Sequence, residues 1–366
     1  MIRILHVVSM MHVGGMESYI MNMYRKIDRS KVQFDFLVHY NERAAFEDEI
    51  EAMGGRIFRT TVLDDFNMVK YLRDLDKLFS EHPEFRIVHG HLNITAYWYL
   101  GAAKRHGVPW RIMHCHCPGK INSLKGNIKH LVSRLSPLNA NIRLACSKEA
   151  GEYLFQKRPF EIIPNGIDVE RFRFSEKVRG DVRTDLGLDD KFVIGHVGRF
   201  SREKNHEYML EVFAGVKKQL PDAVLMLLGE GPLLESIQEK ARAMGIADSV
   251  LFLGLIRDCA PYYQAMDAFI MPSLYEGLPL AGIEAQSAAL PCLFTAVSSP
   301  EVKISSDAAF LPIGTEKVDL WVNALKKIAA NRSDRRSITP DAGKYDSAVG
   351  TAKMVERYLN LWEKNL

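Results

Sequence analysis

The chain has 366 residues, of which 47% are hydrophobic and 25% charged, and its formal net charge is +3. This composition is typical of a soluble globular protein that can bury a core, and the length predicts two domains of ordinary size. No stretch approaches the roughly 18 uninterrupted apolar residues of a membrane span. Five cysteines without framework spacing predict a reducing setting, so the expected location is the cytoplasm.

The first half of the chain alternates short apolar runs with longer amphipathic ones. The apolar runs predict strands at Ile2–Val8, Phe34–Val38, Ile87–His89, Arg111–His114 and Arg143–Ala145. Helical spacing predicts helices at Glu17–Lys26, Ala45–Met53, Met68–Glu81 and Thr95–His106. Strands that alternate with helices predict a parallel sheet flanked by helices.

The second half repeats this scheme. Strands are expected at Phe192–Val197, Ala223–Leu228, Val250–Leu253, Ala268–Pro272 and Cys292–Thr295, and helices at Glu207–Gln219, Leu233–Met244 and Pro279–Ala288. We therefore expect an α/β protein of two doubly wound, Rossmann-like domains, residues 1–168 and 169–346. Ligands bind outside the carboxyl ends of such strands, so the domains are expected to face one another across a cleft. Residues 347–366 have the apolar spacing of an amphipathic helix.

Gly14 and Gly15 fall in the first strand-to-helix turn. One interpretation is a tight turn, where glycine is common. The other is that the backbone approaches a donor or acceptor molecule closely. We favour the second, because the first turn of this fold is where nucleotides bind.

The stretch from Lys104 to Lys148 holds nine basic residues and no acidic one. A run of charge is commonly a solvated face, and this interpretation carries as much weight as a functional one. The functional alternatives are contact with an anionic membrane surface or with a phosphate-bearing acceptor. Lys120, Lys125 and Lys129 would be neighbours if residues 122–133 form a helix. No recognition motif accompanies the stretch, so nucleic acid is not an expected partner.

The segment His114-Cys115-His116-Cys117 invites a zinc hypothesis. On a strand the two histidines face one side and the two cysteines the other. The remaining cysteines are isolated in the sequence, so no second cluster completes a set of four ligands. We therefore expect no metal.

Two clusters in the second half are the most informative features of the chain. The first, Gly198 to Asn205, follows a predicted strand directly and places Arg199 and Lys204 five positions apart. An arginine gives forked contacts and a lysine a point charge, a combination that suits a diphosphate. A surface pair is the plain alternative, but the position at the end of a buried strand favours the functional one.

The second cluster runs from Ser273 to Glu284 and predicts a loop that enters a helix, with Pro279 at the first helical position. Glu276 and Glu284 cannot bind phosphate, but they can accept hydrogen bonds from sugar hydroxyls. A nucleotide-sugar needs both kinds of group. Backbone donors for the phosphates are expected at the positive end of this helix, around Gly277, Leu278 and Leu280.

A glycosidase with two carboxylates is a rival interpretation. If Glu276 and Glu284 lay on one helix, eight residues would separate them by about 12 Å. That exceeds the roughly 5–9.5 Å that glycoside hydrolases use. Hydrolysis would also leave Arg199 and Lys204 without a purpose.

Together these motifs resemble glycosyltransferase family 4, the retaining enzymes with the GT-B fold, of the kind used in bacterial exopolysaccharide or capsular polysaccharide synthesis. The resemblance implies metal-independent, retaining transfer of a hexose from a nucleotide diphosphate, expected to be a UDP-sugar, to a lipid-linked glycan acceptor. It implies no cofactor, and a final helix that packs back on the first domain. The matching segments run in the family's order: Gly14-Gly15-Met16-Glu17, Ile163–Asp168, Gly198-Arg199, Lys204-Asn205, Leu228–Pro232 and Glu276-x7-Glu284.

The resemblance also implies roles for single residues. The first domain would lie on the acceptor side and present His116 beside the donor sugar. The second domain would bind the donor, with Glu284 at the ribose and Glu276 at the sugar. The nucleobase would lie against backbone groups at Leu253 and Leu255. Catalysis would rest on His116, Glu276, Arg199 and Lys204, and the glycines of the first turn would also lie at the donor.

Three other functions remain as alternatives. The same fold hosts nucleotide-sugar epimerases, and fold alone does not decide chemistry. A non-catalytic nucleotide-binding protein would have the donor site without an acceptor site. A dinucleotide-dependent oxidoreductase is disfavoured, because the first turn reads Val13-Gly14-Gly15-Met16-Glu17-Ser18 and lacks the Gly-x-Gly-x-x-Gly pattern.

Overall fold

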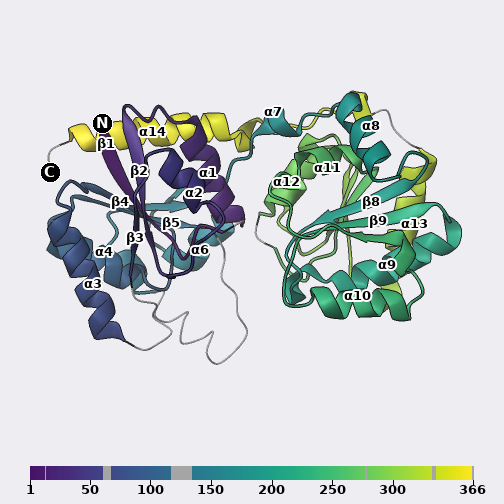
Figure 1. Cartoon of the computed structure of the whole chain (residues 1–366), viewed down its shortest axis with the longest axis horizontal. Coiled ribbons are helices and arrows are strands. Elements are labelled where there is room, and N and C mark those ends of the chain that lie inside the picture. Colours follow the sequence, from purple (N-terminus) through teal and green to yellow (C-terminus); the bar gives the residue numbers. More distant parts are fainter. Residues whose placement is uncertain (13, 61–66, 117–133, 277, 332–334, 365–366) are drawn as a thin grey trace. The chain divides into compact units, whose positions relative to one another are not determined.

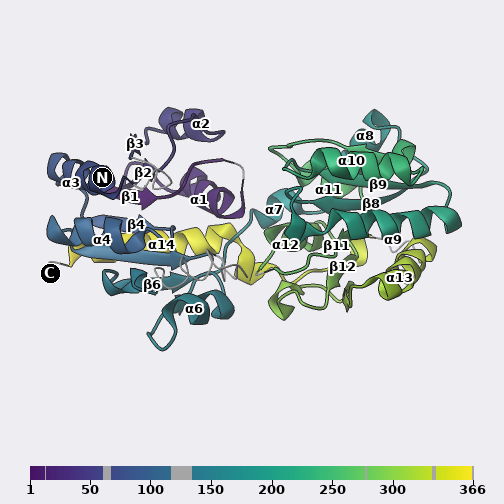
Figure 2. The same cartoon turned by 90° about the horizontal axis from the view of Figure 1, so that it is seen from below.

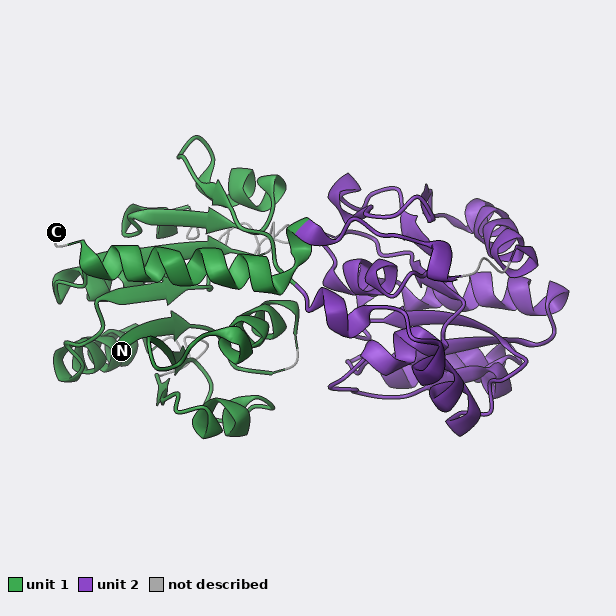
Figure 3. Ribbon diagram, turned by 90° about the horizontal axis from the view of Figure 1, so that it is seen from above, with its two compact units in different colours: residues 1–166, 344–366 green, residues 167–343 purple. Residues whose placement is uncertain are grey.

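The computed structural model describes the chain except for residues 13, 61–66, 117–133, 277, 332–334 and 365–366. The chain forms two compact units (Figure 3). Unit 1 comprises Met1–Gly166 together with Lys344–Leu366, and unit 2 comprises Ile167–Gly343. The polypeptide therefore leaves unit 1 near residue 166 and returns to it near residue 344.

Unit 1 is built on a sheet in which every pairing is parallel. Its described strands are β1 (Ile2–Val7), β2 (Val32–Val38), β3 (Ile57–Arg59), β4 (Ile87–Gly90), β5 (Trp110–Cys115), β6 (Ile142–Ala145) and β7 (Glu161–Ile162). The strand order is β3-β2-β1-β4-β5-β6-β7. The order reverses between β1 and β4, which makes this the switch point of the sheet, the place where ligands bind in doubly wound folds.

Helices cover both faces of this sheet (Figure 1). One core contains side chains of α1, α2 and the final helix α14, and the other contains side chains of α3, α4 and α6. Strands buried on both faces explain why their sequences read as continuous apolar runs. The helices are α1 (Gly15–Lys26), α2 (Glu47–Ala52), α3 (Met68–Glu81), α4 (Ala96–Arg105), α6 (Lys148–Phe155) and α14 (Ser347–Glu363), with a short η2 (Ser136–Leu138).

The helix α14 belongs to unit 1 although it ends the chain. It packs against α1 (Figure 1). Its residues Met354, Tyr358 and Leu361 are buried in the same core as β1 and β2. Asp346 caps its first turn, since the carboxylate accepts a hydrogen bond from the Ala348 N–H at 2.8 Å. The amphipathic spacing of this segment thus reflects burial against the first sheet.

Unit 2 also has a wholly parallel sheet among its described residues. Its strands are β8 (Phe192–Val197), β9 (Ala223–Leu228), β10 (Val250–Phe252), β11 (Ala268–Met271), β12 (Cys292–Thr295) and β13 (Ala308–Leu311). Their order, β10-β9-β8-β11-β12-β13, is that of the doubly wound dinucleotide-binding fold. The order reverses between β8 and β11.

The main core of unit 2 lies between the sheet and the helices α9, α10 and α13, and α9 and α13 pack side by side (Figure 2). Trp321 of α13 is fully buried in it and donates its indole N–H to the Pro312 carbonyl at 2.9 Å. The helices are α7 (Val169–Phe172), α8 (Glu176–Asp185), α9 (His206–Gln219), α10 (Leu234–Ala243), α11 (Ala260–Ala265), α12 (Leu280–Ser287) and α13 (Val318–Ala330). Short 3-10 turns are η3 (Arg202–Lys204), η4 (Ala247–Ser249), η5 (Pro300–Val302), η6 (Thr315–Lys317), η7 (Arg335–Ser337) and η8 (Gly343–Tyr345). The last of these turns begins in unit 2 and ends in unit 1.

The expected strands and helices are present, and the sequence analysis missed three strands at sheet edges. β3, β7 and β13 are edge strands of two to four residues, and most of their residues are exposed or half-buried. Such strands lack the long apolar run that identifies a buried strand. Among the described residues, no helix combines the length and the apolar character needed to cross a membrane.

Candidate functional site

The two sequence clusters of the second half lie at the switch point of unit 2. The first cluster follows β8 and the second follows β11, and these strands are neighbours in the sheet. Both loops therefore leave the same edge of the sheet, at the point where the strand order reverses. Residues more than seventy positions apart are brought together there by the topology.

Backbone contacts join these two loops. The Leu274 N–H donates to the Glu203 carbonyl at 2.8 Å, and the Asn205 side-chain amide donates to the Pro272 carbonyl at 3.0 Å. Asn205 adopts a left-handed conformation, with φ of 57°, which lets the chain turn from η3 into α9. Asparagine tolerates this region better than most residues. The loop that carries Arg199 and Lys204 is thus held against the loop that carries Glu276.

Lys204 and Glu276 form an ion pair across these loops. Lys204 Nζ lies 2.5 Å from Glu276 Oε1, and their side chains are 18% and 13% exposed. The sequence analysis assigned these residues separately to the phosphates and the sugar, whereas the structure couples them. An anion that approaches Lys204 meets an ammonium group that a carboxylate already neutralises, so its binding would involve both residues.

Arg199 is exposed at the end of β8, and two glycines shape the loop beneath it. Gly229 has φ of +139° and Gly231 has φ of +156°. A Cβ atom on Gly229 would lie 2.1 Å from the Gly198 carbonyl oxygen, and one on Gly231 would lie 2.4 Å from that of Phe200. The loop after β9 therefore packs directly on the backbone of the Gly198–Asn205 loop, a contact that only glycine permits.

The helix α12 begins one residue later than expected. Pro279 is its N-cap in an extended conformation, and Leu280 is the first helical residue. The sequence analysis placed Pro279 itself at the first helical position. The difference arises because φ near −65° suits both positions. Leu278 and Leu280 are half-buried at this helix start, and Gly277 lies outside the described residues.

Glu284 lies in the second turn of α12 and accepts a hydrogen bond from the Tyr263 hydroxyl at 2.9 Å. Burial raises the pKa of Glu284 to about 7, an effect that the Tyr263 hydrogen bond and the charge of Arg171 oppose. Because Glu276 precedes α12, the two carboxylates do not share one helix. The rise along one helix therefore does not give the distance between the Glu276 and Glu284 carboxylates, and the expected separation of about 12 Å no longer excludes a glycosidase.

Leu253 and Leu255 follow β10, whose carboxyl end is next to that of β9. The Leu253 N–H donates to the Leu227 carbonyl at 3.0 Å, and the intervening Gly254 carbonyl accepts from the Gly229 N–H at 2.8 Å. Leu255 is 45% exposed. These residues thus share the edge of unit 2 with the loops after β8 and β9, and their contact with a nucleobase remains a prediction.

In unit 1, Gly14 is the N-cap of α1 and has extended backbone angles, so its conformation does not require glycine. A Cβ on Gly14 would lie 2.4 Å from Oε2 of Glu17, which is the end of a flexible side chain that can move aside, so the surrounding space does not require glycine either. Burial raises the pKa of the Glu17 carboxyl, while a hydrogen bond from its own backbone N–H lowers it. This start of α1 therefore already holds a carboxyl group, and the role of Gly14 and Gly15 in binding remains a prediction.

His116 lies at the end of β5 in contact with other histidines. His114 and His116 were expected to stand apart from any second cluster, and this expectation is wrong. Three more histidines, His6, His89 and His91, converge on them from β1 and β4. Nitrogen atoms of His91, His114 and His116 lie within 4.8 Å of one another, as do those of His6, His89 and His91. The sequence offered one signal, the same His-x-His spacing at residues 89–91 and 114–116.

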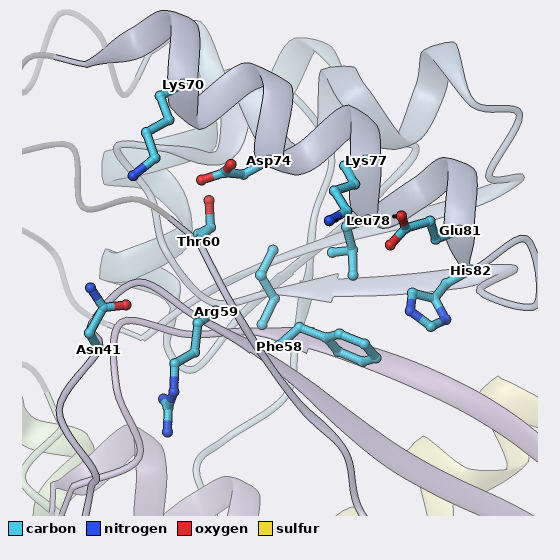
Figure 4. Close-up of a pocket in the computed structure, with 11 residues that line it drawn as sticks. Asn41, Phe58, Arg59, Thr60, Lys70, Asp74, Lys77, Leu78, Glu81 and His82 are labelled. Carbon is cyan, nitrogen blue, oxygen red and sulfur yellow. Dashed lines mark ion pairs between the residues drawn. The ribbon is translucent and has the colours of Figure 1, made fainter.

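A pocket of about 460 Å³ lies elsewhere in unit 1, between α3 and the end of β3 (Figure 4). Two of its cations are engaged with partners: Lys77 pairs with Glu81 at 3.9 Å, and Arg59 pairs with the buried Glu47 at 2.5 Å. None of the residues predicted for the site lines this pocket. It therefore does not enter the site described above.

Comparison with known proteins assigns the family. Residues 13–171 match the model of glycosyltransferase family 4, and residues 179–345 match that of glycosyl transferases group 1. EpsF of Bacillus subtilis (strain 168), which is named as a glycosyltransferase, is 35% identical over 91% of this chain and 89% of its own length. The chain belongs to glycosyltransferase family 4. This glycosyltransferase therefore carries the fold and the family predicted from its motifs.

Two further comparisons extend the match over nearly the whole chain. An Escherichia coli enzyme named UDP-Gal:alpha-D-GlcNAc-diphosphoundecaprenol alpha-1,3-galactosyltransferase is 26% identical over 90% of this chain and 89% of its own length. The crystal structure of Anabaena HepE in complex with UDP and glucose superposes with a TM-score of 0.78, at 17% identity, over 98% of this chain and all of that one. The two Rossmann-like units are those of the GT-B fold.

Proposed function

We propose that this glycosyltransferase transfers a hexose from a UDP-sugar to a lipid-linked glycan in polysaccharide synthesis, with retention of anomeric configuration. The observation that carries the proposal is the Lys204–Glu276 ion pair at the switch point of unit 2 in a family 4 glycosyltransferase, where the loop of Lys204 also carries Arg199. The E. coli relative acts on a diphosphoundecaprenol-linked sugar, and HepE binds UDP. Both facts support this choice of donor and acceptor.

In the proposed reaction the bond between sugar C1 and the diphosphate oxygen breaks, and the acceptor hydroxyl oxygen bonds to C1 on the same face. The acceptor proton passes to the departing diphosphate. Arg199 and Lys204 would neutralise the charge that develops on that diphosphate. Glu276 would hold the sugar and Glu284 the ribose hydroxyls, each as a hydrogen-bond acceptor. Two fixed cations supply the charge that a divalent ion gives in other transferases, so we propose that transfer is metal-independent.

We expect labelled hexose to pass from a UDP-hexose to an undecaprenyl-diphosphate-linked sugar in the presence of EDTA. The measurement is the label in the lipid fraction, with NMR of the product to establish the anomeric configuration. Inversion at C1 would contradict retention, and activity lost in EDTA and restored by Mg²⁺ or Mn²⁺ would contradict metal independence. Interconversion of the donor without transfer would establish an epimerase, and binding without either reaction would establish a nucleotide-binding protein.

Glu284 should make donor binding pH-dependent. The ionised carboxylate accepts hydrogen bonds from both ribose hydroxyls, and with a pKa of about 7 it is mostly protonated at pH 6. We expect the Kd for UDP-glucose to rise by about five- to tenfold between pH 8 and pH 6. Calorimetry measures this, and UDP-glucose suits it because its diphosphate carries no proton in that range. Glu284→Gln should bind more weakly with a flat profile, and a wild-type profile just as flat would contradict the role.

We also propose that the protein contacts a membrane, and the structure reduces the number of basic residues that could do so. Within the basic stretch 104–148, Arg111 and Arg143 bind backbone carbonyls, and Arg105 pairs with Asp76 at 2.8 Å. These three arginines are therefore engaged in contacts within unit 1. Lys120, Lys125 and Lys129 lie outside the described residues.

Four large apolar side chains flank that part of the chain. Ile94, Tyr97, Leu135 and Leu138 are between 38% and 53% exposed, and the Asn139 amide donates to the Tyr97 carbonyl at 2.8 Å, which joins the two segments. Exposed apolar residues beside a basic stretch suit an anionic bilayer. We expect sedimentation with anionic liposomes that weakens with salt and with Lys120→Glu, Lys125→Glu and Lys129→Glu combined. Equal sedimentation with neutral vesicles, or none with anionic ones, would remove the membrane from the proposal.

A further inference from the structure

Five histidines of unit 1 gather on one face of its sheet, at the switch point. His6 lies on β1 directly opposite His89 on β4, and His114 lies on β5. His91 and His116 follow two positions after His89 and His114, so strand alternation places each pair on the same face. The first four are buried, and His116 is half-buried at the edge of the cluster.

Three of these rings form a continuous chain of hydrogen bonds. His6 Nδ1 lies 3.0 Å from His91 Nε2, and His91 Nδ1 lies 2.8 Å from His116 Nε2. The chain ends at Asn165, because His116 Nδ1 lies 2.7 Å from the side-chain oxygen of this buried residue. Both ring nitrogens of His91 and of His116 are therefore engaged by protein groups.

The chemistry of the groups fixes which nitrogen donates and which accepts in each of these hydrogen bonds. The Asn165 side-chain oxygen can only accept, so His116 Nδ1 carries the proton. A neutral imidazole has one N–H, so His116 Nε2 must accept, and His91 Nδ1 must donate to it. Because the single N–H of His91 is on Nδ1, its Nε2 must accept, and the donor is His6 Nδ1. All three histidines are thereby the Nδ1–H tautomer. Among the described residues His6 Nε2 has no partner, which places the end of the chain there.

The surroundings keep these rings uncharged. Burial lowers the pKa of His6 to about 3 and that of His116 to about 4. Burial and then the charges of neighbouring histidines hold the pKa of His91 well below its usual value. An added proton on His91 or His116 would set two N–H groups against one another across a bond of the chain. At neutral pH the chain is therefore neutral from His6 to Asn165.

We propose that His6, His91 and Asn165 are positioning residues that hold His116 as a neutral Nδ1–H imidazole with both nitrogens occupied. His116 then acts in transfer through its fixed ring and backbone, and not as a general acid or base. The role in transfer rests on the proposed function, whereas the tautomers and the neutrality of the chain do not. The other two histidines form a separate set of hydrogen bonds, in which Tyr358 of α14 bonds His89 Nδ1 at 2.6 Å and His89 Nε2 lies 3.3 Å from His114 Nδ1.

The tautomers are measured by ¹⁵N NMR of the full chain labelled at histidine, with long-range ¹H–¹⁵N couplings to distinguish Nδ1–H from Nε2–H. Single His→Gln variants assign the signals. We expect His6, His91 and His116 to be neutral Nδ1–H rings, unchanged from pH 8 to pH 5.5. Asn165→Leu should leave His116 without a single tautomer, because it removes the acceptor that places the proton on Nδ1. His91→Leu should keep the Nδ1–H tautomer of His116 but shift its Nε2 signal, because the hydrogen bond to Nε2 is lost, and His91→Gln, which keeps a donor, should restore that signal in part.

The kinetic arm uses the same variants. We expect His91→Leu to lower kcat by about ten- to hundredfold while the Kd for UDP stays within a few-fold, with partial recovery in His91→Gln. The matched control is His39→Gln. His39 is another buried histidine of unit 1, bonded to the Val8 carbonyl and the Tyr71 hydroxyl outside the chain, so this variant should keep both the signals and the rate.

Several results would overturn the inference. An Nε2–H or charged His116 in the wild type would contradict the chain, and so would stoichiometric binding of Zn²⁺ that shifts all three signals, because the cluster would then be an ion site. A normal kcat for a folded His91→Leu would contradict the positioning role. If the wild type transfers no sugar to any acceptor, the proposed function fails, while the NMR result still decides the tautomers.

Discussion

Lys204→Ala and Arg199→Ala are each expected to lower turnover by roughly a hundred- to a thousandfold. This is the loss seen when an enzyme loses one of the groups that stabilise a developing negative charge on oxygen. For Lys204 the structure adds a second reason. Its partner Glu276 is 13% exposed and would remain as an unpaired carboxylate facing the incoming diphosphate. Steady-state transfer from a UDP-sugar measures kcat, and calorimetry measures donor affinity separately.

The matched control is Arg202→Ala, because Arg202 is an exposed cation of the same loop. It should keep a near-normal rate. The double variant Lys204→Ala/Glu276→Gln removes the unpaired charge, so it should regain donor affinity relative to Lys204→Ala without regaining turnover. Rates near that of the wild type in both single variants would show that the two cations do not serve the leaving group.

Gly229→Ala should destabilise unit 2 and disable the site together. Its Cβ would lie 2.1 Å from the Gly198 carbonyl oxygen, at a φ of +139° that side chains rarely adopt. Strain of about 1–3 kcal/mol adds to a clash with backbone that cannot yield cheaply. We expect a loss of about 3 kcal/mol, which corresponds to a melting temperature lower by about 6–12 °C. Turnover should also fall, because the displaced backbone carries Arg199.

Gly245→Ala separates the cost of the positive φ from the cost of the clash. Gly245 also has a positive φ, +67°, but no atom lies within 4 Å of the Cβ position. This variant should lose only about 1–2 kcal/mol, the cost of a left-handed residue, and should transfer sugar at the normal rate. Equal losses in Gly229→Ala and Gly245→Ala would show that the close approach to the Gly198 loop contributes nothing.

The predictable part of the site consists of features that are local in sequence. Arg199 and Lys204 follow β8 within a few residues, and Glu276 follows β11 in the same way. A buried parallel strand shows as a continuous apolar run, so the positions directly after it can be found without a structure. The same reasoning placed the loops of unit 2 at one edge of its sheet. Edge strands such as β3 and β13 escaped it because half-exposed residues carry no such run.

The sequence by itself determined the fold class, the buried strands and the family, because apolar runs, helical spacing and loop motifs are encoded by neighbouring residues. Only the tertiary structure decided which side chains meet. Lys204 and Glu276 are 72 positions apart, and His6 and His91 are 85 apart. A parallel sheet makes such pairs by strand order, and strand order follows from packing over the whole unit. His114 and His116 thus became members of a cluster of five histidines, and His116 belongs to a hydrogen-bonded chain whose direction is set by Asn165.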